Sequence, residues 1–353
     1  MNLHAVTLQP VRDQPTTNKL FDGDLNVKEH QEIMLNANIE VWEEAIKEFT
    51  FETFYITLSR DEAYSLMLVN VNKQLKDGTI VAEELNEYIP AGFDYNFCYE
   101  PILKQLEEKI QNKIDEIGAT TGFFIKTSSR SPKDAPSACE KLLDLYRNRI
   151  KEKDDRSFDA KLDSLFWASC QCLKVFTAID AINLLSSSDR IRTDMFVALS
   201  PDLAYRWNQN LVLRKWVDIE PDMEFRGFVH KNKFTALCQY NHQMLSRRLV
   251  RDKLKIQEII LAFWEENIKP RLAGQVDDYI VDFALTGDDF ATCWVVELNP
   301  FLSSTSPNLF SWTKDIRVLC DGPFEFRIRE KSSPGVLGGM VESWRDIIKN
   351  VEI

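Results

Sequence analysis

The sequence predicts an α+β fold in which helices cover antiparallel sheets. Three observations lead to this prediction: a strong helical pattern at 101–117, short strand patterns joined by tight turns after residue 195, and a hairpin pattern at 278–298. With 353 residues and 44% hydrophobic content, the chain can bury a large core in two domains or in one bilobal fold.

The predicted helices are recognised by their apolar spacing and by the residues at their ends. The clearest helix covers 101–117, and Gly118 is well placed to stop it. Ser137 and Glu140 suit a capping box for a helix that runs to about residue 153. Further helices are expected over 158–176 and 178–187, and along an amphipathic stretch from Ile256 to Ile268 that Pro270 ends.

The predicted strands are short runs of β-branched and aromatic residues. One run, 121–126, ends in a lysine, and another covers 196–199. Strands at 224–230 and 234–239 are joined by a tight Lys-Asn-Lys turn. The remaining strands are expected at 210–219, 278–285 and 291–298.

Composition and charge exclude several classes of protein. The formal charge of -12 argues against a nucleic-acid partner, because phosphate binding requires a net basic face. No run of about 18 apolar residues is present and the N-terminus lacks a secretory pattern, so we expect no membrane partner and a cytoplasmic protein. The seven scattered cysteines indicate reduced thiols, and the four histidines have no spacing typical of a zinc site or a Ser/His pair.

A lysine at the end of a predicted strand is the first candidate for phosphate binding. Lys126 is followed by the polar loop 127–134, whose hydroxyl groups, Arg130 and Lys133 can donate hydrogen bonds to phosphate oxygens. The loop lacks the glycines of a P-loop. The alternative is a solvated lysine at a strand end.

A second candidate site interrupts the apolar strand at 211–217, where Arg214, Lys215 and Trp216 are adjacent. Polar groups in such a strand need partners, and a nucleotide supplies them. Strand backbone can bind the edge of the base, while Arg214 or Lys215 can reach ribose or phosphate. Basic residues on an exposed sheet face are the alternative.

Arg226 is a third candidate, as a ligand of a terminal phosphate. It shares one face of its predicted strand with Glu224 and Phe228, because side chains alternate along a strand. The alternative is a surface ion pair between Arg226 and Glu224, which would contribute little.

The last predicted hairpin carries a candidate metal site. A turn centred on residues 288–289 places Asp282 opposite Val295 and diagonal to Glu297, with Asn299 on the same face. Two carboxylates and an amide suit a hard cation such as Mg²⁺, which keeps several waters and also binds substrate phosphates. The alternative is that Asp282 and Glu297 face solvent on a two-sided strand pair.

These segments, in this order, resemble the cell division cycle protein 123 family. The resemblance covers about residues 121–312, and its most specific parts are the Leu-Arg-Lys-Trp and Glu-Phe-Arg runs and an Asn-Pro-Phe ending. The chain departs from the family pattern at Ser128 and Ser129, where the family usually has Asn-Trp, and at Glu297, where it usually has Asp. The matching stretches are 124–126, 131–135, 184–189, 211–216, 224–229, 296–301 and 309–312.

The resemblance implies an ATP-grasp fold, with ATP between two lobes, in an assembly chaperone that binds the gamma subunit of eukaryotic translation initiation factor 2. Residues 96–205 would form the first lobe with the phosphate loop, and 206–353 the second lobe with the metal-binding hairpin. Residues 1–95 would form a divergent N-terminal region packed on this core.

The resemblance also implies roles for individual residues. Lys126, with Ser129, Arg130 and Asp134 of the loop, would bind the phosphates of ATP, and Arg226 would meet the terminal phosphate. In an enzyme, Arg226 and Lys126 would be catalytic. The remaining assignments are Arg214, Lys215, Trp216 and Val217 along adenine and ribose, Gln239 in the same cleft, and Asp282, Glu297 and Asn299 as ligands of Mg²⁺.

Three functions remain compatible with the sequence. The first is an ATP-dependent assembly chaperone, which we favour because no second-substrate motif is evident. The second is an ATP-grasp ligase that activates a carboxylate as an acyl phosphate for attack by an amine. The third is a scaffold without nucleotide, against which the retained Lys126 and Asp282 argue.

Overall fold

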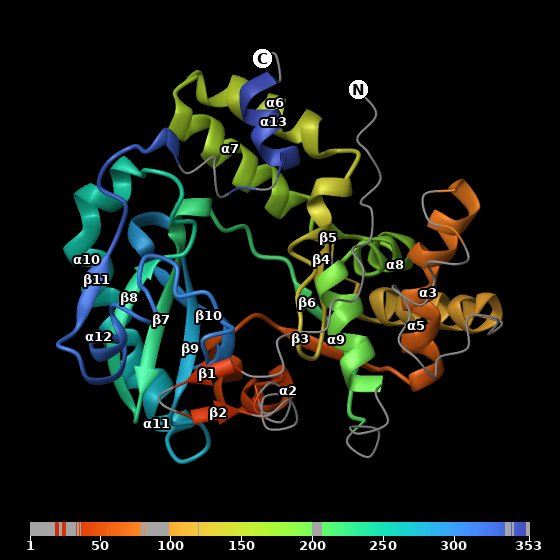
Figure 1. Cartoon of the computed structure of the whole chain (residues 1–353), viewed down its shortest axis with the longest axis horizontal. Coiled ribbons are helices and arrows are strands. Elements are labelled where there is room, and N and C mark those ends of the chain that lie inside the picture. The colour runs from red at the N-terminus through yellow and green to blue at the C-terminus, as the bar shows by residue number, and fades with distance from the viewer. Residues whose placement is uncertain are drawn as a thin grey trace. The chain divides into compact units, whose positions relative to one another are not determined.

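The structure is a computed structural model of the chain, and it describes residues 18–20, 23–25, 33, 35, 37–78, 81, 99–118, 120–199, 207–335, 340 and 342–350. These residues form two compact units, each with its own sheet (Figure 1). Within the described residues, the first unit contains Glu52–Leu143 and Ser169–Trp216, and the second contains the rest. The units are interleaved along the sequence, and the predicted division at residues 95 and 205 stays a prediction.

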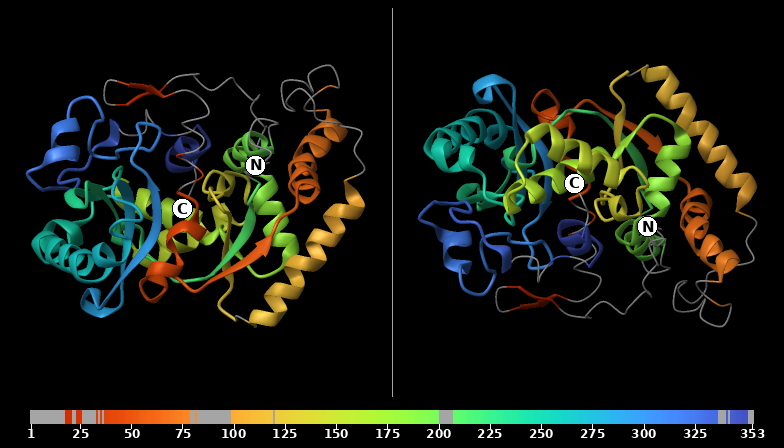
Figure 2. Two further views of the ribbon diagram at one scale, coloured as in Figure 1. Left: turned by 90° about the horizontal axis from the view of Figure 1, so that it is seen from below. Right: turned by 90° about the horizontal axis from the view of Figure 1, so that it is seen from above.

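The first unit is built on a four-stranded sheet in the order β3-β6-β4-β5, in which every pair is antiparallel. Four helices share one apolar core with a single face of this sheet, to which Ile56, Ile125 and Leu213 contribute (Figure 2). The strands are β3 (Thr53–Thr57), β6 (Asn210–Lys215), β4 (Phe123–Thr127) and β5 (Lys174–Val175), and the helices are α3 (Arg60–Asp77), α5 (Glu100–Ile117), α8 (Ala178–Ser186) and α9 (Asp189–Leu199).

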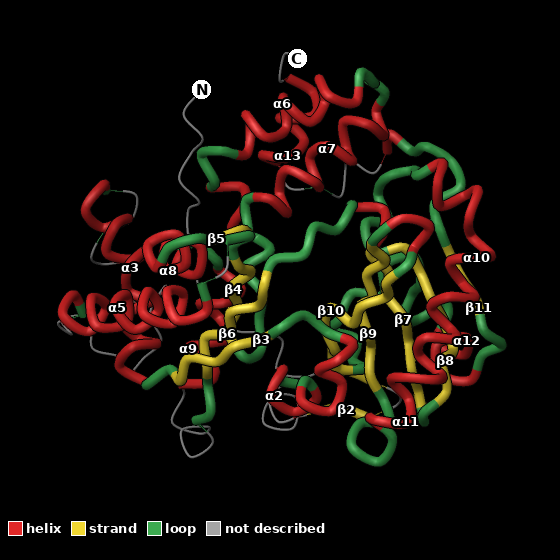
Figure 3. Tube along the Cα trace, turned by 180° about the vertical axis from the view of Figure 1, so that it is seen from behind, coloured by secondary structure: helices red, strands yellow, loops and turns green. Residues whose placement is uncertain are grey.

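The second unit is built on a five-stranded sheet in the order β10-β9-β7-β8-β11 (Figure 3). Within this sheet only β11 runs parallel to its neighbour. Its strands are β7 (Glu224–His230), β8 (Lys233–Gln239), β9 (Tyr279–Thr286), β10 (Thr292–Pro300) and β11 (Glu325–Arg327).

Helices pack on both faces of this second sheet. On one face, α10 (Arg247–Phe263) continues through a π-helical turn (Trp264–Ile268) into α11 (Lys269–Leu272), and the rings of Phe263 and Phe283 meet at 6.2 Å. On the other face, Leu319 of α12 (Ile316–Asp321) shares a core with Phe228. The sheet is therefore buried on both sides, and polar side chains within it need partners inside the protein.

The remaining described elements are short or peripheral. No helix in the described part of the chain combines the length and apolarity needed to cross a membrane. The six cysteines within the described ranges are unpaired thiols, as predicted, while Cys98 lies outside them. The elements are β1 (Asn18–Leu20), β2 (Gly23–Leu25), α2 (Ile39–Trp42), α6 (Leu142–Lys153), α7 (Phe158–Gln171) and α13 (Glu342–Asn350), with 3₁₀ turns at Glu44–Phe49, Ala135–Ala138, Pro221–Met223 and Asp288–Phe290.

The α+β prediction is confirmed, with three local corrections. The predicted strand 196–199 is wrong, because Ile191, Met195 and Phe196 lie on one buried face of helix α9. The predicted helix 158–176 ends at Gln171, and a two-residue strand follows it. Pro270 does not end the helical path, because it occupies the first turn of α11, where no N–H donor is required.

Candidate functional site

Two buried cations lie on one face of the first sheet. Strand register places Lys126 opposite Val212 and Arg214 opposite Phe124, so both cations lie on the face that the four helices leave uncovered. Lys126 is 3% exposed and Arg214 is 2% exposed. The alternative of a solvated Lys126 is therefore wrong.

Lys215, the neighbour of Arg214, lies on the opposite face of the sheet. Its ammonium pairs with Glu52 at 2.5 Å and lies 5.9 Å from the ring centroid of Phe54. Alternation along β6 thus separates the two basic residues, and of the pair only Arg214 shares a face with Lys126. Trp216 follows, with its N–H bonded to the Gly122 carbonyl at 3.1 Å, and Val217 begins the second unit.

The loop after Lys126 is tied to helix α9. Arg130 donates two hydrogen bonds to the carboxylate of Asp194, from Nε at 2.7 Å and from an Nη at 3.1 Å, and Ser129 donates a longer one at 3.3 Å. Such a bidentate pair fixes orientation as well as charge. In this structure Arg130 and Ser129 therefore hold the loop in place.

Asp134 organises the start of the same helix. Its carboxylate accepts hydrogen bonds from the Ser188 hydroxyl at 2.6 Å and from the Arg190 N–H at 3.1 Å. The Ser188 hydroxyl in turn accepts from the Ile191 N–H at 3.1 Å, in the manner of an N-cap. This contact joins two of the stretches that carry the family resemblance, and it gives Asp134 a structural role.

The second sheet brings Asp282, Glu297 and Asn299 together. A bulge between Val295 and Glu297 shifts the register, so that Glu297, and not Val295 as predicted, lies directly opposite Asp282. Without the bulge, Glu297 would lie on the other face, because one extra residue inverts the alternation. Asn299 also donates a hydrogen bond from Nδ2 to Oδ2 of Asp282 at 3.1 Å.

Asp282 is fully buried and forms a bidentate ion pair with Arg226 on the neighbouring strand β7. The Nε–Oδ1 and Nη2–Oδ2 distances are both 2.8 Å, and Nη1 of Arg226 donates to the Ser306 carbonyl at 2.8 Å. The alternative of a surface pair between Arg226 and Glu224 is therefore wrong, and so is the alternative of a solvent-facing Asp282.

The Arg226–Asp282 pair sets the electrostatics of this sheet. Burial, the largest single effect, acts to lower the pKa of Arg226, but the charge and hydrogen bonds of Asp282 together outweigh it and raise the pKa. The guanidinium also lies 5.0 Å from the ring centroid of Tyr240. The arginine is thus a permanent cation that neutralises the buried carboxylate.

Gln239 is not brought together with these residues. It pairs in register with Phe225 and so lies on the face opposite to Arg226. Its Nε2 donates to the carbonyls of Asn241 at 2.9 Å and Met244 at 3.0 Å, and its Oε1 accepts from the Arg329 N–H at 3.1 Å. These bonds give the buried Gln239 a role in holding loops.

The chemistry of Asp282, Glu297 and Asn299 fits a magnesium ion. Two carboxylates and an amide oxygen are hard ligands, and Mg²⁺ uses few protein ligands together with water and phosphate oxygens. The Asn299 amide donates through Nδ2, which leaves its oxygen as an acceptor. Among the described residues, no group of three or more His, Cys, Asp or Glu could hold a metal ion. These residues therefore contain no metal site with three or more ligands of those types.

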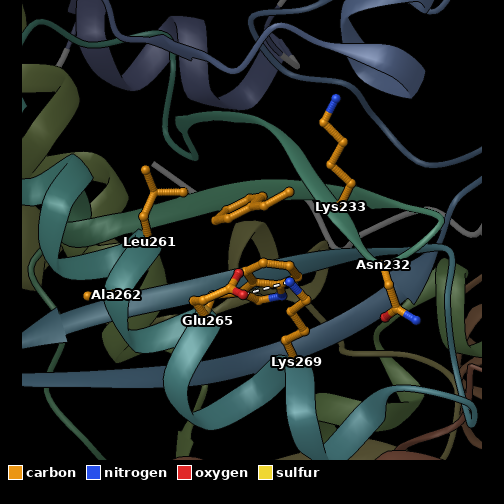
Figure 4. A pocket seen from close by; sticks show the side chains of 8 residues that line it. Asn232, Lys233, Leu261, Ala262, Glu265 and Lys269 are labelled. Atoms are coloured by element: carbon orange, nitrogen blue, oxygen red, sulfur yellow. Dashed lines mark hydrogen bonds and ion pairs between the residues drawn. The ribbon is translucent and has the colours of Figure 1, made fainter.

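A surface cavity of about 450 Å³ lies elsewhere in the second unit (Figure 4). Phe234 and Trp264 are among the residues that line it, and so are Lys269 and Glu265, which form an ion pair at 2.6 Å. None of the candidate residues lines it. The remaining lining residues are Asn232, Lys233, Leu261 and Ala262.

Sequence reasoning missed several partners that the fold supplies. Asp194 and Ser188 lie more than 50 positions from the loop residues they bind, and the Ser306 carbonyl lies 80 positions from Arg226. No local pattern connects residues at such separations. The one available signal was that the stretches 131–135 and 184–189, which contain Asp134 and Ser188, both resemble the family.

The fold is that of an α+β protein of the ATP-grasp type. The solved structure of Cdc123 from Schizosaccharomyces pombe is similar, with a TM-score of 0.56 and 19% identity over 85% of this chain and 98% of that chain. At this identity the likeness concerns the fold alone.

The family follows from sequence comparison. The model of the D123 family matches residues 143–334, more than half of the 353 residues. A relative from Xenopus laevis, named translation initiation factor eIF2 assembly protein, is 26% identical over 86% of this chain and 83% of its own length. A relative from Danio rerio with the same name is 33% identical over 40% of this chain and 44% of its own. The chain belongs to the D123 family, the cell division cycle protein 123 family that its motifs predicted.

Proposed function

We propose that this protein is a Mg-ATP-binding assembly chaperone of translation initiation factor eIF2 and that it binds the gamma subunit. The observation that carries the proposal is the shared name of its relatives: proteins from Xenopus laevis, Danio rerio and Dictyostelium discoideum, 26–33% identical to this chain, are each named eIF2 assembly protein. The relatives' shared name supports the protein partner. The candidate residues for phosphate and Mg²⁺ binding support the nucleotide.

The phosphate part of the proposal rests on the first sheet. Lys126 and Arg214 share a buried sheet face, and the four strands present no Asp or Glu on that face. A triphosphate carries several negative charges, and charge-assisted hydrogen bonds to a buried cation are among the strongest in proteins. The Arg130–Asp194 pair supports this site by holding the adjacent loop on α9.

The metal part of the proposal rests on the second sheet. Asp282, Glu297 and Asn299 provide oxygen ligands, and Arg226 neutralises Asp282 in the absence of ligand. A bound Mg²⁺ would supply positive charge to Asp282, while a terminal phosphate would supply negative charge to Arg226. Each ion of the pair can therefore exchange its partner for a ligand whose charge has the same sign as that partner's.

The proposal is tested by assembly of the purified chain with the purified eIF2 gamma subunit. We expect a complex on size-exclusion chromatography that is stronger with Mg-ATP than with EDTA. Lys126→Met should weaken the ATP-dependent part, and Lys104→Met, at an exposed position of α5, serves as the matched control. Absence of a complex at micromolar concentrations would contradict the chaperone function.

The same reagents separate the chaperone from a ligase. A chaperone should form ADP slowly, at a rate that amino acids and peptides do not change. ADP formation that rises strongly with such an acceptor would make the protein an ATP-grasp ligase instead.

A further inference from the structure

Two cysteines of the first unit are in hydrogen-bond contact with each other. Cys139 precedes helix α6 and Cys172 directly follows helix α7, so the pair lies at the two ends of the segment that contains these helices. The thiol of Cys172 donates a hydrogen bond to the sulfur of Cys139. Both residues belong to the first unit, and both are only partly buried. The fold thus brings together two partly exposed thiols that are distant in the sequence.

The surroundings of Cys139 favour its thiolate form. The hydrogen bond from Cys172 is the main cause, and together with the N–H groups of Lys141 and Leu142 it lowers the pKa of Cys139 to about 6, although burial acts in the opposite direction. These N–H groups lie at the start of α6, where the helix dipole also favours a negative charge. The thiolate is the reactive form of cysteine. Cys139 is therefore the nucleophile of the pair at neutral pH.

Cys172 has the complementary environment. Its hydrogen bond to Cys139 and its burial raise the pKa of Cys172, so it keeps its proton. Cysteines that respond to peroxide often lie next to such a second thiol, which resolves the oxidised sulfur. A metal site is the alternative use of adjacent cysteines. Among the residues that the structure describes, however, no third His, Cys, Asp or Glu joins the pair in a group that could hold a metal ion.

We propose that Cys139 and Cys172 are a reversible redox pair, which hydrogen peroxide oxidises to an intramolecular disulfide. The bond closes the loop of residues 139–172 and joins the segment that follows the Lys126 loop to the segment that precedes β5. Thiols that are already in contact can form this bond with little movement of the backbone. The inference is independent of the proposed ATP site and of the proposed eIF2 partner.

The oxidation takes place in two steps. The Cys139 thiolate attacks one oxygen of hydrogen peroxide, the O–O bond breaks, and the hydroxide that leaves takes up a proton from solvent. The sulfur of Cys172 then attacks the sulfenic acid on Cys139, the S–O bond breaks, and water leaves with the Cys172 proton. In total, two thiols are oxidised to one disulfide and one hydrogen peroxide is reduced to two waters. A dithiol reductant reverses the reaction.

The test maps the disulfides that form under mild oxidation. The reduced full chain is treated with a molar excess of hydrogen peroxide, both in native buffer and in urea. The remaining thiols are blocked with iodoacetamide, and linked peptides are identified by mass spectrometry. The same procedure is applied to Cys139→Ser, Cys172→Ser and the matched control Cys320→Ser. Cys320 is also partly exposed, but burial raises its pKa to about 11.

We expect a peptide pair linked through Cys139 and Cys172 in the native chain and in Cys320→Ser. Dithiothreitol should remove the link, and both single variants of the pair should lack it. In urea the fold no longer holds the pair together, so links to Cys170, which is close to Cys172 in the sequence, should compete. Because the native chain itself gives the result, the test does not depend on the folding of the variants.

Reactivity before oxidation gives a second readout. At neutral pH, iodoacetamide should modify Cys139 at least about tenfold faster than Cys320, because far more of Cys139 is thiolate. Equal rates would overturn the assignment of Cys139 as the nucleophile. A native chain without a link between Cys139 and Cys172, with the same mixture of links as in urea, or with links between two chains instead would overturn the redox pair.

Discussion

The two sheets of this protein carry their buried charges in different arrangements. In the second sheet, Arg226 is held by Asp282, and the pair lies within two adjacent strands. In the first sheet, Lys126 and Arg214 share one face, and the four strands themselves contain no Asp or Glu. The second sheet thus places an acid beside its buried base, whereas the strands of the first sheet place two buried bases on one face.

The difference agrees with the proposed division of ligands between the two sheets. Two basic side chains on one sheet face suit phosphate groups. A neutral Arg–Asp pair is stable alone and offers a carboxylate to a metal ion. Under the proposed function, Lys126 and Arg214 bind phosphate groups, Asp282 binds Mg²⁺ and Arg226 meets the terminal phosphate. Substitutions in the two sheets should therefore have different consequences.

The largest effect is expected at the balanced pair. Asp282→Ala leaves the buried Arg226 without its counter-ion and should lower the free energy of unfolding by about 3–5 kcal/mol. Urea denaturation without ATP measures this. The double variant Arg226→Met with Asp282→Leu removes both charges and should recover most of the loss. If Asp282→Ala were as stable as the native chain, Arg226 would not need Asp282 as its counter-ion, and the description of this sheet would be contradicted.

The next effect is expected at the first sheet. Lys126→Met should weaken Mg-ATP binding by about 2 kcal/mol, roughly 30-fold, because one charge-assisted hydrogen bond is lost. It should lower the free energy of unfolding of the ligand-free chain by less than Asp282→Ala does. Calorimetry and urea denaturation measure the two quantities. A large loss of stability with unchanged ATP affinity would make Lys126 a structural residue and remove the contrast between the sheets.

An intermediate effect is expected on the other face of the second sheet. A Cβ atom at Gly227 would lie 2.5 Å from the Phe234 ring and 3.1 Å from the Phe283 ring. Gly227→Ala should therefore lower the free energy of unfolding by about 1–3 kcal/mol through overpacking. Thermal denaturation of Gly227→Ala, and of the same variant with Phe234→Leu, tests this. If the smaller ring partner gives no recovery, the packing explanation is wrong.

The smallest effect is expected at the helix that supports the first sheet. Ser59 and Glu62 form a capping box at the start of α3, with Ser59 Oγ accepting from the Glu62 N–H at 3.2 Å. Ser59→Ala should cost about 1 kcal/mol and leave ATP affinity unchanged. Denaturation and ATP titration on one preparation measure both, and a change in affinity would show that the helices contribute to the ligand face.

The sequence predicted that Asp282, Glu297 and Asn299 share one sheet face, but it did so through a register that was wrong. The predicted pair of Asp282 with Val295 put Glu297 and Asn299 on the face of Asp282. In the structure Val295 lies opposite Phe283 instead, and the bulge after it places Glu297 opposite Asp282. Glu297 and Asn299 therefore still share the face of Asp282. Nothing in the Val295–Glu297 stretch signals the bulge, since it contains no glycine or proline.

The same physics explains the error at Gln239. A regular hairpin from the Lys231–Asn232 turn would place Gln239 on the face of Arg226. A register shift between Phe228 and Val229 moves Gln239 to the opposite face. Local patterns therefore predicted the strands and the residue types of the site. They could not predict the bulges, or distant partners such as Asp194, because these depend on tertiary packing.

The central claim is the proposed binding of Mg-ATP, in which Glu297 is a ligand of Mg²⁺. Calorimetric titration of ATP, with Mg²⁺ and with EDTA, on the native chain and on Glu297→Ala tests it most directly. The account predicts tighter binding with Mg²⁺ in the native chain and loss of that difference in Glu297→Ala. Equal ATP affinity with and without Mg²⁺ in the native chain, or no binding at all, would contradict it.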